Sequence, residues 1–293
     1  MNPIKPSAVR AIVLSCLALP VGAGLAWAGS SQPYEKLAAD VAPVLVTVKF
    51  VLKLGGRFGD SENESEITGM MVDPKGLVLC ASSKLGVPRR FGSATPTDIK
   101  ILVGDDTEGL EADVLARDTE LDLAWVKIKK PPEKSFLHLD MTKTAEPKLG
   151  DALFSVRRMA KFFDRTPTVS DGVLAGRTKK PRDLLVPGGA LNIEPGAPVF
   201  TSDGAFVGLV VLQLPEDEEM EGNPMAFFAM GRDLANGLIL PAAQVVKATQ
   251  RAGQIAEDEE DEDEGDETPA AKGADAKHDT KNGDENDDDD DDD

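Results

Sequence analysis

The chain has 293 residues, with 41% hydrophobic and 29% charged residues and a formal net charge of −20. Residues 257–293 alone hold 21 acidic residues and three lysines, a net charge of −18. The rest of the chain is therefore close to neutral, and the acidic segment repels anionic surfaces, so we expect no nucleic-acid partner. A block of like charges buries little apolar surface, and we predict that 257–293 is a disordered acidic tail.

Residues 1–28 have the pattern of a secretory signal peptide. Lys5 and Arg10 form a basic start, 11–25 are mostly apolar or small, and Ala26-Trp27-Ala28 fits a cleavage site. The alternative is an uncleaved membrane anchor, but the apolar run is interrupted and short for a span of about 20 residues. After cleavage we expect no membrane span. Cys80 is the only cysteine beyond the signal, so no intrachain disulfide can form. This pattern fits a bacterial envelope protein that is periplasmic or secreted.

The next residues, up to about 128, predict a series of short strands. A helix-like start near Ala39 leads into a β run at 44–51, and 55–65 has the composition of a loop. A hairpin is expected at 67–72 and 77–80, because Asp73-Pro74-Lys75-Gly76 has the proline and glycine of a tight turn. Further strands are predicted at 98–103, 112–116 and 123–128. Two prolines within 129–134 indicate a linker.

The second half repeats this style. We predict strands at 152–156, 168–175, 197–200 and 206–212, with a turn at Asp203-Gly204, an acidic loop at 215–223 and a closing helix at 240–255. Residues 29–256 suit one two-lobed all-β unit or two small domains. The chain has no P-loop, dinucleotide fingerprint or zinc-type Cys/His spacing, so we expect no cofactor and no metal site.

Three segments carry a family resemblance. Residues 68–79, TGMMVDPKGLVL, resemble the HtrA-type stretch that leads to the catalytic histidine. Residues 118–128, DTELDLAWVKI, are similar to the segment around the family's aspartate. Residues 193–199, IEPGAPV, resemble G-N-S-G-G-P-L, which contains the nucleophilic serine. Residues 168–175 and 237–241 match two further strands in order.

The chain thus resembles the HtrA/Deg-type trypsin-like serine proteases from about Leu37 to Arg251, without a following PDZ domain. The resemblance implies a trypsin-like double β-barrel with a short C-terminal helix. It places Ser83 where the family has its histidine, Asp122 at the aspartate and Pro195 at the nucleophile. We therefore expect degenerate triad positions and no functional catalytic residue.

The chemistry of these replacements predicts inactivity. Serine proteolysis needs a hydroxyl nucleophile, an imidazole base and oxyanion donors. Beyond the signal the only histidines are His138 and His278, and neither matches the motif. Ser83 has no useful basicity at neutral pH, and Pro195 lacks both the hydroxyl and a main-chain N–H.

Other interpretations remain. Asp122 is a catalytic relic or, as we favour, a residue that binds loop amides. Cys80 is a replacement nucleophile or, as we favour, a small core residue. A Ser83–Lys84 dyad is disfavoured because neighbours in an extended segment point in opposite directions.

We therefore predict a pseudoprotease that acts as a binding or scaffolding module for an unknown peptide or protein ligand. The alternatives are a hydrolase with a non-standard site, or a surface protein whose acidic tail weakly binds divalent cations such as Ca²⁺.

Overall fold

The computed structural model describes residues 31–54, 61–86, 94–213 and 237–265. Within these residues, two α-helices lie before and after twelve strands in the chain, and three short 3₁₀ helices lie between them. The helices are α1 (Gln32–Val41), η1 (Ala42–Val44), η2 (Ser82–Lys84), η3 (Lys161–Phe163) and α5 (Ala242–Gly265). Within the described residues, no helix is long and apolar enough to cross a membrane.

The first six strands form a closed antiparallel barrel. They are β1 (Leu45–Leu54), β2 (Ser61–Met71), β3 (Leu77–Ala81), β4 (Ala94–Val103), β5 (Leu110–Asp118) and β6 (Leu123–Ile128), joined in the order β1-β2-β3-β6-β5-β4. The predicted hairpin is confirmed, because Val72 N–H donates to Leu77 O at 2.9 Å across the turn and Gly76 has φ 96°. Val48, Phe50 and Val126 belong to the core of this barrel.

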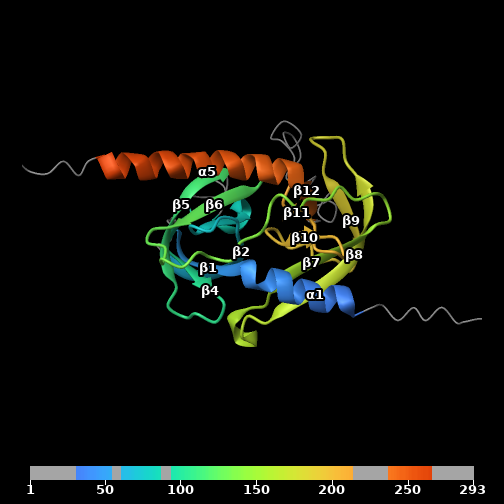
Figure 1. The fold of residues 1–293 in the computed structure, drawn as a ribbon, viewed down its shortest axis with the longest axis horizontal. Helices are drawn as coiled ribbons and strands as arrows, with labels where there is room; N and C mark the ends of the chain where they lie inside the picture. Colours follow the sequence, from blue (N-terminus) through green and yellow to red (C-terminus); the bar gives the residue numbers. More distant parts are fainter. Residues whose placement is uncertain (1–30, 55–60, 87–93, 214–236, 266–293) are drawn as a thin grey trace, which may run out of the picture.

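The last six strands form a second closed barrel. They are β7 (Ala152–Arg158), β8 (Pro167–Arg177), β9 (Leu185–Gly189), β10 (Pro198–Phe200), β11 (Phe206–Val211) and β12 (Leu238–Pro241), in the order β10-β11-β12-β9-β8-β7. Leu153, Val199 and Val210 lie in its core. The predicted trypsin-like double β-barrel with a C-terminal helix is confirmed (Figure 1).

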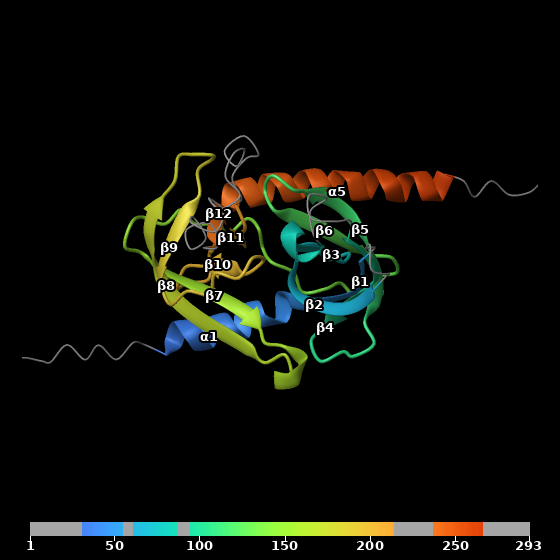
Figure 2. The same ribbon diagram turned by 180° about the vertical axis from the view of Figure 1, so that it is seen from behind.

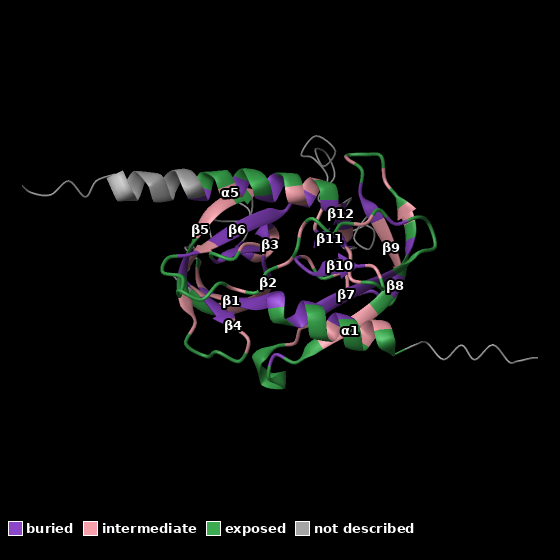
Figure 3. Ribbon diagram, in the orientation of Figure 1, coloured by how far each residue is buried: buried purple, intermediate pink, exposed green. Residues whose placement is uncertain are grey.

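A third apolar cluster joins the two barrels. It contains Leu45 and Trp125 from the first barrel, Phe200 and Leu240 from the second, and residues from both long helices. Figure 3 shows the buried residues concentrated in the strands between the two helices. This shared core makes the two barrels pack as one body.

Each α-helix contacts the barrel that is formed by the other half of the chain. Helix α1 precedes the first barrel but lies against β7 and β8 (Figure 2). There the ring of Tyr34 packs edge-on against Phe154, with the ring centroids 5.6 Å apart. Helix α5 follows the second barrel and reaches β5 and β6 of the first (Figure 1). There Trp125 Nε1–H donates to Thr249 Oγ1 at 3.1 Å.

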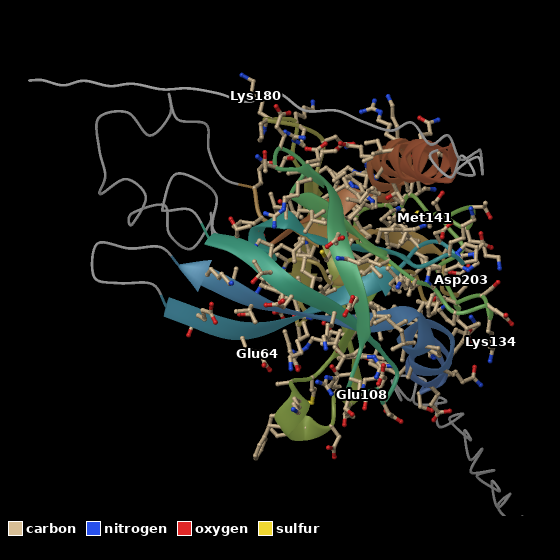
Figure 4. The ribbon with its side chains drawn as sticks, turned by 90° about the vertical axis from the view of Figure 1, so that its left-hand side faces the viewer. Glu64, Glu108, Lys134, Met141, Lys180 and Asp203 are labelled. Carbon is tan, nitrogen blue, oxygen red and sulfur yellow. The ribbon has the colours of Figure 1, made fainter. Side chains whose placement is uncertain are left out.

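Several predicted boundaries were wrong. Ser61–Ser65 was assigned to a loop but belongs to β2, because it pairs with 50–54 of β1. The linker is longer than 129–134, since β6 ends at Ile128 and β7 begins at Ala152. Its later part bonds to the second barrel, where Ala145 N–H donates to Phe206 O at 2.9 Å. In Figure 4, Met141 of this connection and Asp203 of the β10–β11 turn lie on the same side of the molecule.

The C-terminal helix also departs from the prediction. It starts at Ala242 and runs to Gly265, so the predicted start of the disordered tail at 257 lies inside α5. Repulsion between acidic side chains opposes burial, but each residue added to an existing helix gains a main-chain hydrogen bond at low cost. The signal peptide, the loop at 215–223, His278 and the tail beyond 265 lie outside the described residues.

Candidate functional site

Ser83 stands at the predicted base position, in the 3₁₀ turn η2 directly after β3. Its main-chain N–H donates to Asp122 Oδ1 at 2.6 Å, and its hydroxyl donates to Asp122 Oδ2 at 3.0 Å. The structure therefore brings Ser83 and Asp122 into direct contact, as the motif alignment predicts. The hydroxyl acts as a donor to the carboxylate.

Asp122 lies in the tight turn between β5 and β6 with φ 58°, a left-handed conformation that aspartate tolerates better than most residues. Its side chain is buried, and its main-chain oxygen accepts a hydrogen bond from Ser82 N–H at 3.1 Å. Leu212 N–H, just past β11 of the second barrel, donates to Asp122 Oδ2 at 2.7 Å. One carboxylate thus binds both barrels.

Burial raises the pKa of the Asp122 carboxyl above its ordinary value. The hydrogen bonds from Leu212 and Ser83 and the nearby charge of Lys84 favour the ionised form, but they offset only part of this effect. The carboxyl accepts three donors from the protein itself. This arrangement is that of a structural acceptor for loop amides, the interpretation that we favoured from the sequence.

Pro195 lies in the loop before β10, and this loop packs against the first barrel. Gly196 has φ 92°, and its N–H donates to Val210 O at 2.8 Å. A Cβ at Gly196 would lie 3.4 Å from Ala81 N and 3.6 Å from Thr68 O, so the loop passes close to β3 and β2. The nucleophile position thereby lies beside the segment that carries Ser83.

A small hollow opens where these segments meet. Its lining comes from both barrels and consists of Ile67, Thr68, Lys84, Arg157, Asn192, Glu194, Pro195 and Ala197. Glu194 lies between two cations, with Oε1 3.1 Å from Lys84 Nζ and Oε2 3.8 Å from Arg157 Nη1. This hollow between the barrels, which we call the groove, is therefore charged, a property that the triad alignment did not address.

Among the described residues, neither alternative nucleophile, Cys80 or Ser83, forms a hydrogen bond with a histidine or lysine side chain. Cys80 is buried in β3 with its thiol 3.7 Å from Ala124 O, and burial raises the pKa of Cys80 to about 12, so the thiol stays protonated at neutral pH. Ser83 bonds Asp122, whereas Lys84 bonds Glu194. The expectation that Ser83 and Lys84 have different partners agrees with these contacts, although the segment is a 3₁₀ turn and is not extended as predicted.

His138 lies in the connection between the barrels, and its ring is exposed. Its Nδ1 is 3.2 Å from Phe136 O, a contact within its own segment. No other histidine falls within the described residues. Among these residues, no group of three or more His, Cys, Asp or Glu side chains is placed to hold a metal ion.

A second hollow, of about 500 Å³ including open solvent, lies beside β9 in the second barrel. It was missed from the sequence, because β9 is short and its Val-Pro-Gly-Gly residues are typical of a turn. Its lining combines main-chain polar groups with apolar side chains and is formed by Val186, Pro187, Gly188, Gly189, Leu191, Ile193, Gly237 and Leu238. Within the described residues, β12 pairs with β9 only at Leu185, so the edge of β9 beside this hollow is unpaired there.

Comparisons with known proteins agree with this fold. The family model described as a trypsin-like peptidase domain matches residues 67–209. Among solved structures, the chain is similar to the apo form of the MamO protease domain from Magnetospirillum magneticum, with 20% sequence identity and a TM-score of 0.46 over 71% of this chain and 97% of that chain. No curated protein matches the chain in sequence. The two closed barrels and the family match over residues 67–209 together support a trypsin-like double β-barrel fold.

Proposed function

We propose that this protein is a catalytically inactive homologue of the trypsin-like peptidases, exported to the cell envelope, that binds a peptide segment of a partner protein in the groove between its barrels. The observation that carries the proposal is the contact between Ser83 and Asp122. The residue at the base position donates its hydroxyl hydrogen to the carboxylate at 3.0 Å, and a hydroxyl cannot take a proton from a nucleophile at neutral pH.

The loop at the nucleophile position supports the same conclusion. Pro195 has neither a hydroxyl nor a main-chain N–H, so it supplies neither the attacking group nor an oxyanion donor. Loss of one such donor alone typically slows an acyl transfer by about 10²–10³-fold. The buried, protonated thiol of Cys80 argues against a hydrolase that uses this cysteine.

Peptide binding is supported by the edge of β9, which is unpaired beside the hollow as far as residues 31–54, 61–86, 94–213 and 237–265 are concerned. A free strand edge presents main-chain donors and acceptors that an extended peptide can pair with, and adjoining apolar space can accept a side chain. The hollow beside β9 offers both features and adjoins the groove between the barrels, because Ile193 lines the hollow and its neighbours Asn192 and Glu194 line the groove. Export rests on the signal-like pattern of residues 1–28 alone.

Turnover is tested on the chain from residue 29 with a fluorophosphonate probe and with casein. We expect no labelling and no cleavage. Labelling that disappears when one serine is replaced, or turnover that Cys80→Ala abolishes, would show a working site and overturn the inactive assignment.

Binding is tested by fluorescence anisotropy with a library of extended peptides. Val186→Trp places an indole in the hollow beside β9 and is expected to weaken binding about tenfold or more, a loss of one well-packed contact. Leu137→Trp introduces the same side chain at an exposed position in the connection and serves as the control. Equal affinity of the two variants would place the peptide elsewhere.

A further inference from the structure

Glu194 bridges the two barrels through its charge. Its carboxylate lies between Lys84 of the first barrel and Arg157 of the second, at 3.1 and 3.8 Å. We call Lys84 and Arg157 the cation pair. Both cations line the hollow that also contains Pro195, at the centre of the groove.

The cation pair has N–H hydrogen-bond donors that Glu194 does not use. A lysine ammonium has three N–H donors and a guanidinium has five. Lys84 donates one hydrogen bond to Glu194, and the contact of Arg157 with Glu194 is longer than a hydrogen bond. Within the described part of the chain, Glu194 is the carboxylate in direct contact with the cation pair and uses only some of its donors, while the charge of Lys84 also acts on the nearby Asp122 carboxyl.

The Glu194 side chain can move out of contact with the cation pair without a change of fold. Its main chain is fixed, because Glu194 N–H donates to Asn192 Oδ1 at 3.2 Å and Glu194 O accepts from Ala197 N–H at 3.0 Å. Its side chain is 50% exposed, and those of Lys84 and Arg157 are 37% and 39% exposed. Ion pairs exposed to this degree are screened by solvent and add little stability, so exchanging one carboxylate for another costs little.

We propose that the cation pair binds a carboxylate of the peptide held in the groove, and that Glu194 occupies this position in the free protein. This inference rests on the proposed peptide binding and gives it a ligand class, which is peptides with an acidic group. Glu194 shows the chemistry directly, since it is itself a carboxylate bound between the two cations. With Glu194 displaced, the position carries two positive charges and fits an anionic group better than a neutral amide.

The test compares matched peptides on the full chain from residue 29. One peptide, capped at both ends, carries a single glutamate, and its partner carries glutamine at that position. A third peptide has glutamine and a free C-terminal carboxylate. We expect the wild type to prefer at least one carboxylate peptide over the capped glutamine peptide by about two- to fivefold, with the preference falling at high salt. The two carboxylate peptides distinguish a side chain from a chain end.

Two substitutions are expected to shift this preference in opposite directions. Glu194→Gln removes the internal competitor, so it should strengthen binding of the preferred carboxylate peptide several-fold and leave the neutral peptide unchanged. Lys84→Gln with Arg157→Gln should reduce the carboxylate peptides to the affinity of the neutral one. Lys49→Gln breaks another partly exposed ion pair, with Glu64 at 2.9 Å in the first barrel, and is the matched control.

The outcomes separate this inference from the proposed function. If none of the peptides binds, the proposed function fails. If the capped glutamate, capped glutamine and free-carboxylate peptides bind equally, the proposal of peptide binding is retained and the proposal that the cation pair binds a carboxylate is rejected. An unchanged affinity in Glu194→Gln overturns its occupancy by Glu194.

Discussion

Asp122 illustrates how a residue from a catalytic motif can serve as a structural acceptor. Its carboxylate takes hydrogen bonds from two donors of Ser83 and from Leu212 N–H, and it is buried. Its main chain adopts a left-handed conformation that aspartate and asparagine tolerate. The same side chain therefore shapes the β5–β6 turn and holds the end of β11 against it.

Replacing Asp122 with alanine is expected to lower the free energy of unfolding by about 3 kcal/mol or more, because three donors lose their acceptor in a buried place. Asp122→Asn keeps one carbonyl oxygen and the turn conformation, so its loss should be smaller. Urea denaturation measures both. A change of under about 0.5 kcal/mol in Asp122→Ala, typical of a surface substitution, would contradict this structural role.

At this scale the sequence locates residues but not their partners. Asp122 and Ser83 can be placed because each lies in a run that resembles the family. The donor from Leu212 is a main-chain N–H 90 positions away. Because every residue other than proline has this group, the residue type does not predict which N–H will bind Asp122. The pairing of Lys84 with Glu194 joins positions 110 apart, and it follows from how the barrels pack.

At the scale of elements, strands with tight turns were the easiest to predict and isolated short strands the hardest. Residues 73–76 predict their hairpin, because proline and glycine favour the torsion angles of that turn. β9 was missed because its residues favour a turn, and its pairing with β8 decides its conformation. A closing helix was predicted at 240–255, where α5 lies, but the contact of α5 with the first barrel depends on tertiary packing alone.

The contact of α5 with the first barrel leads to a prediction. Thr249→Val keeps the shape of the side chain but removes the acceptor of the buried Trp125 indole N–H, which should cost about 1–3 kcal/mol. Thr249→Ser retains a hydroxyl and is the control. In the chain from residue 29, Trp125 is the only tryptophan, so its fluorescence follows urea unfolding of both variants. Equal stability of the two variants would mean that this hydrogen bond contributes nothing.

At the scale of the whole molecule, the two barrels share one apolar cluster and are joined by Asp122. Protonation of a carboxyl at that junction therefore affects global stability. Burial raises the pKa of Asp122 in the folded protein, so over the range just above the ordinary aspartate pKa the folded state binds more protons than the unfolded state. In that range the contribution of Asp122 to the unfolding free energy falls as pH rises.

We therefore expect the stability of the wild type relative to Asp122→Asn to fall as pH increases from about 4, the ordinary aspartate value, through the raised pKa. Denaturation of both proteins across this range measures the difference, and subtracting the variant removes the titration of the other carboxyls. A relative stability that rises with pH would mean that the hydrogen bonds outweigh burial at Asp122.

The two long helices give the molecule a property that neither barrel has alone. Each helix is continuous with one barrel and packs on the other, so each half of the chain supplies part of the other's surface. Cleavage of the main chain within 129–151 would leave two fragments that still bind one another through the contacts of α1 and α5. The fold is thus suited to reassembly from two separately made pieces, and each piece alone would expose the apolar face that its counterpart's helix normally covers.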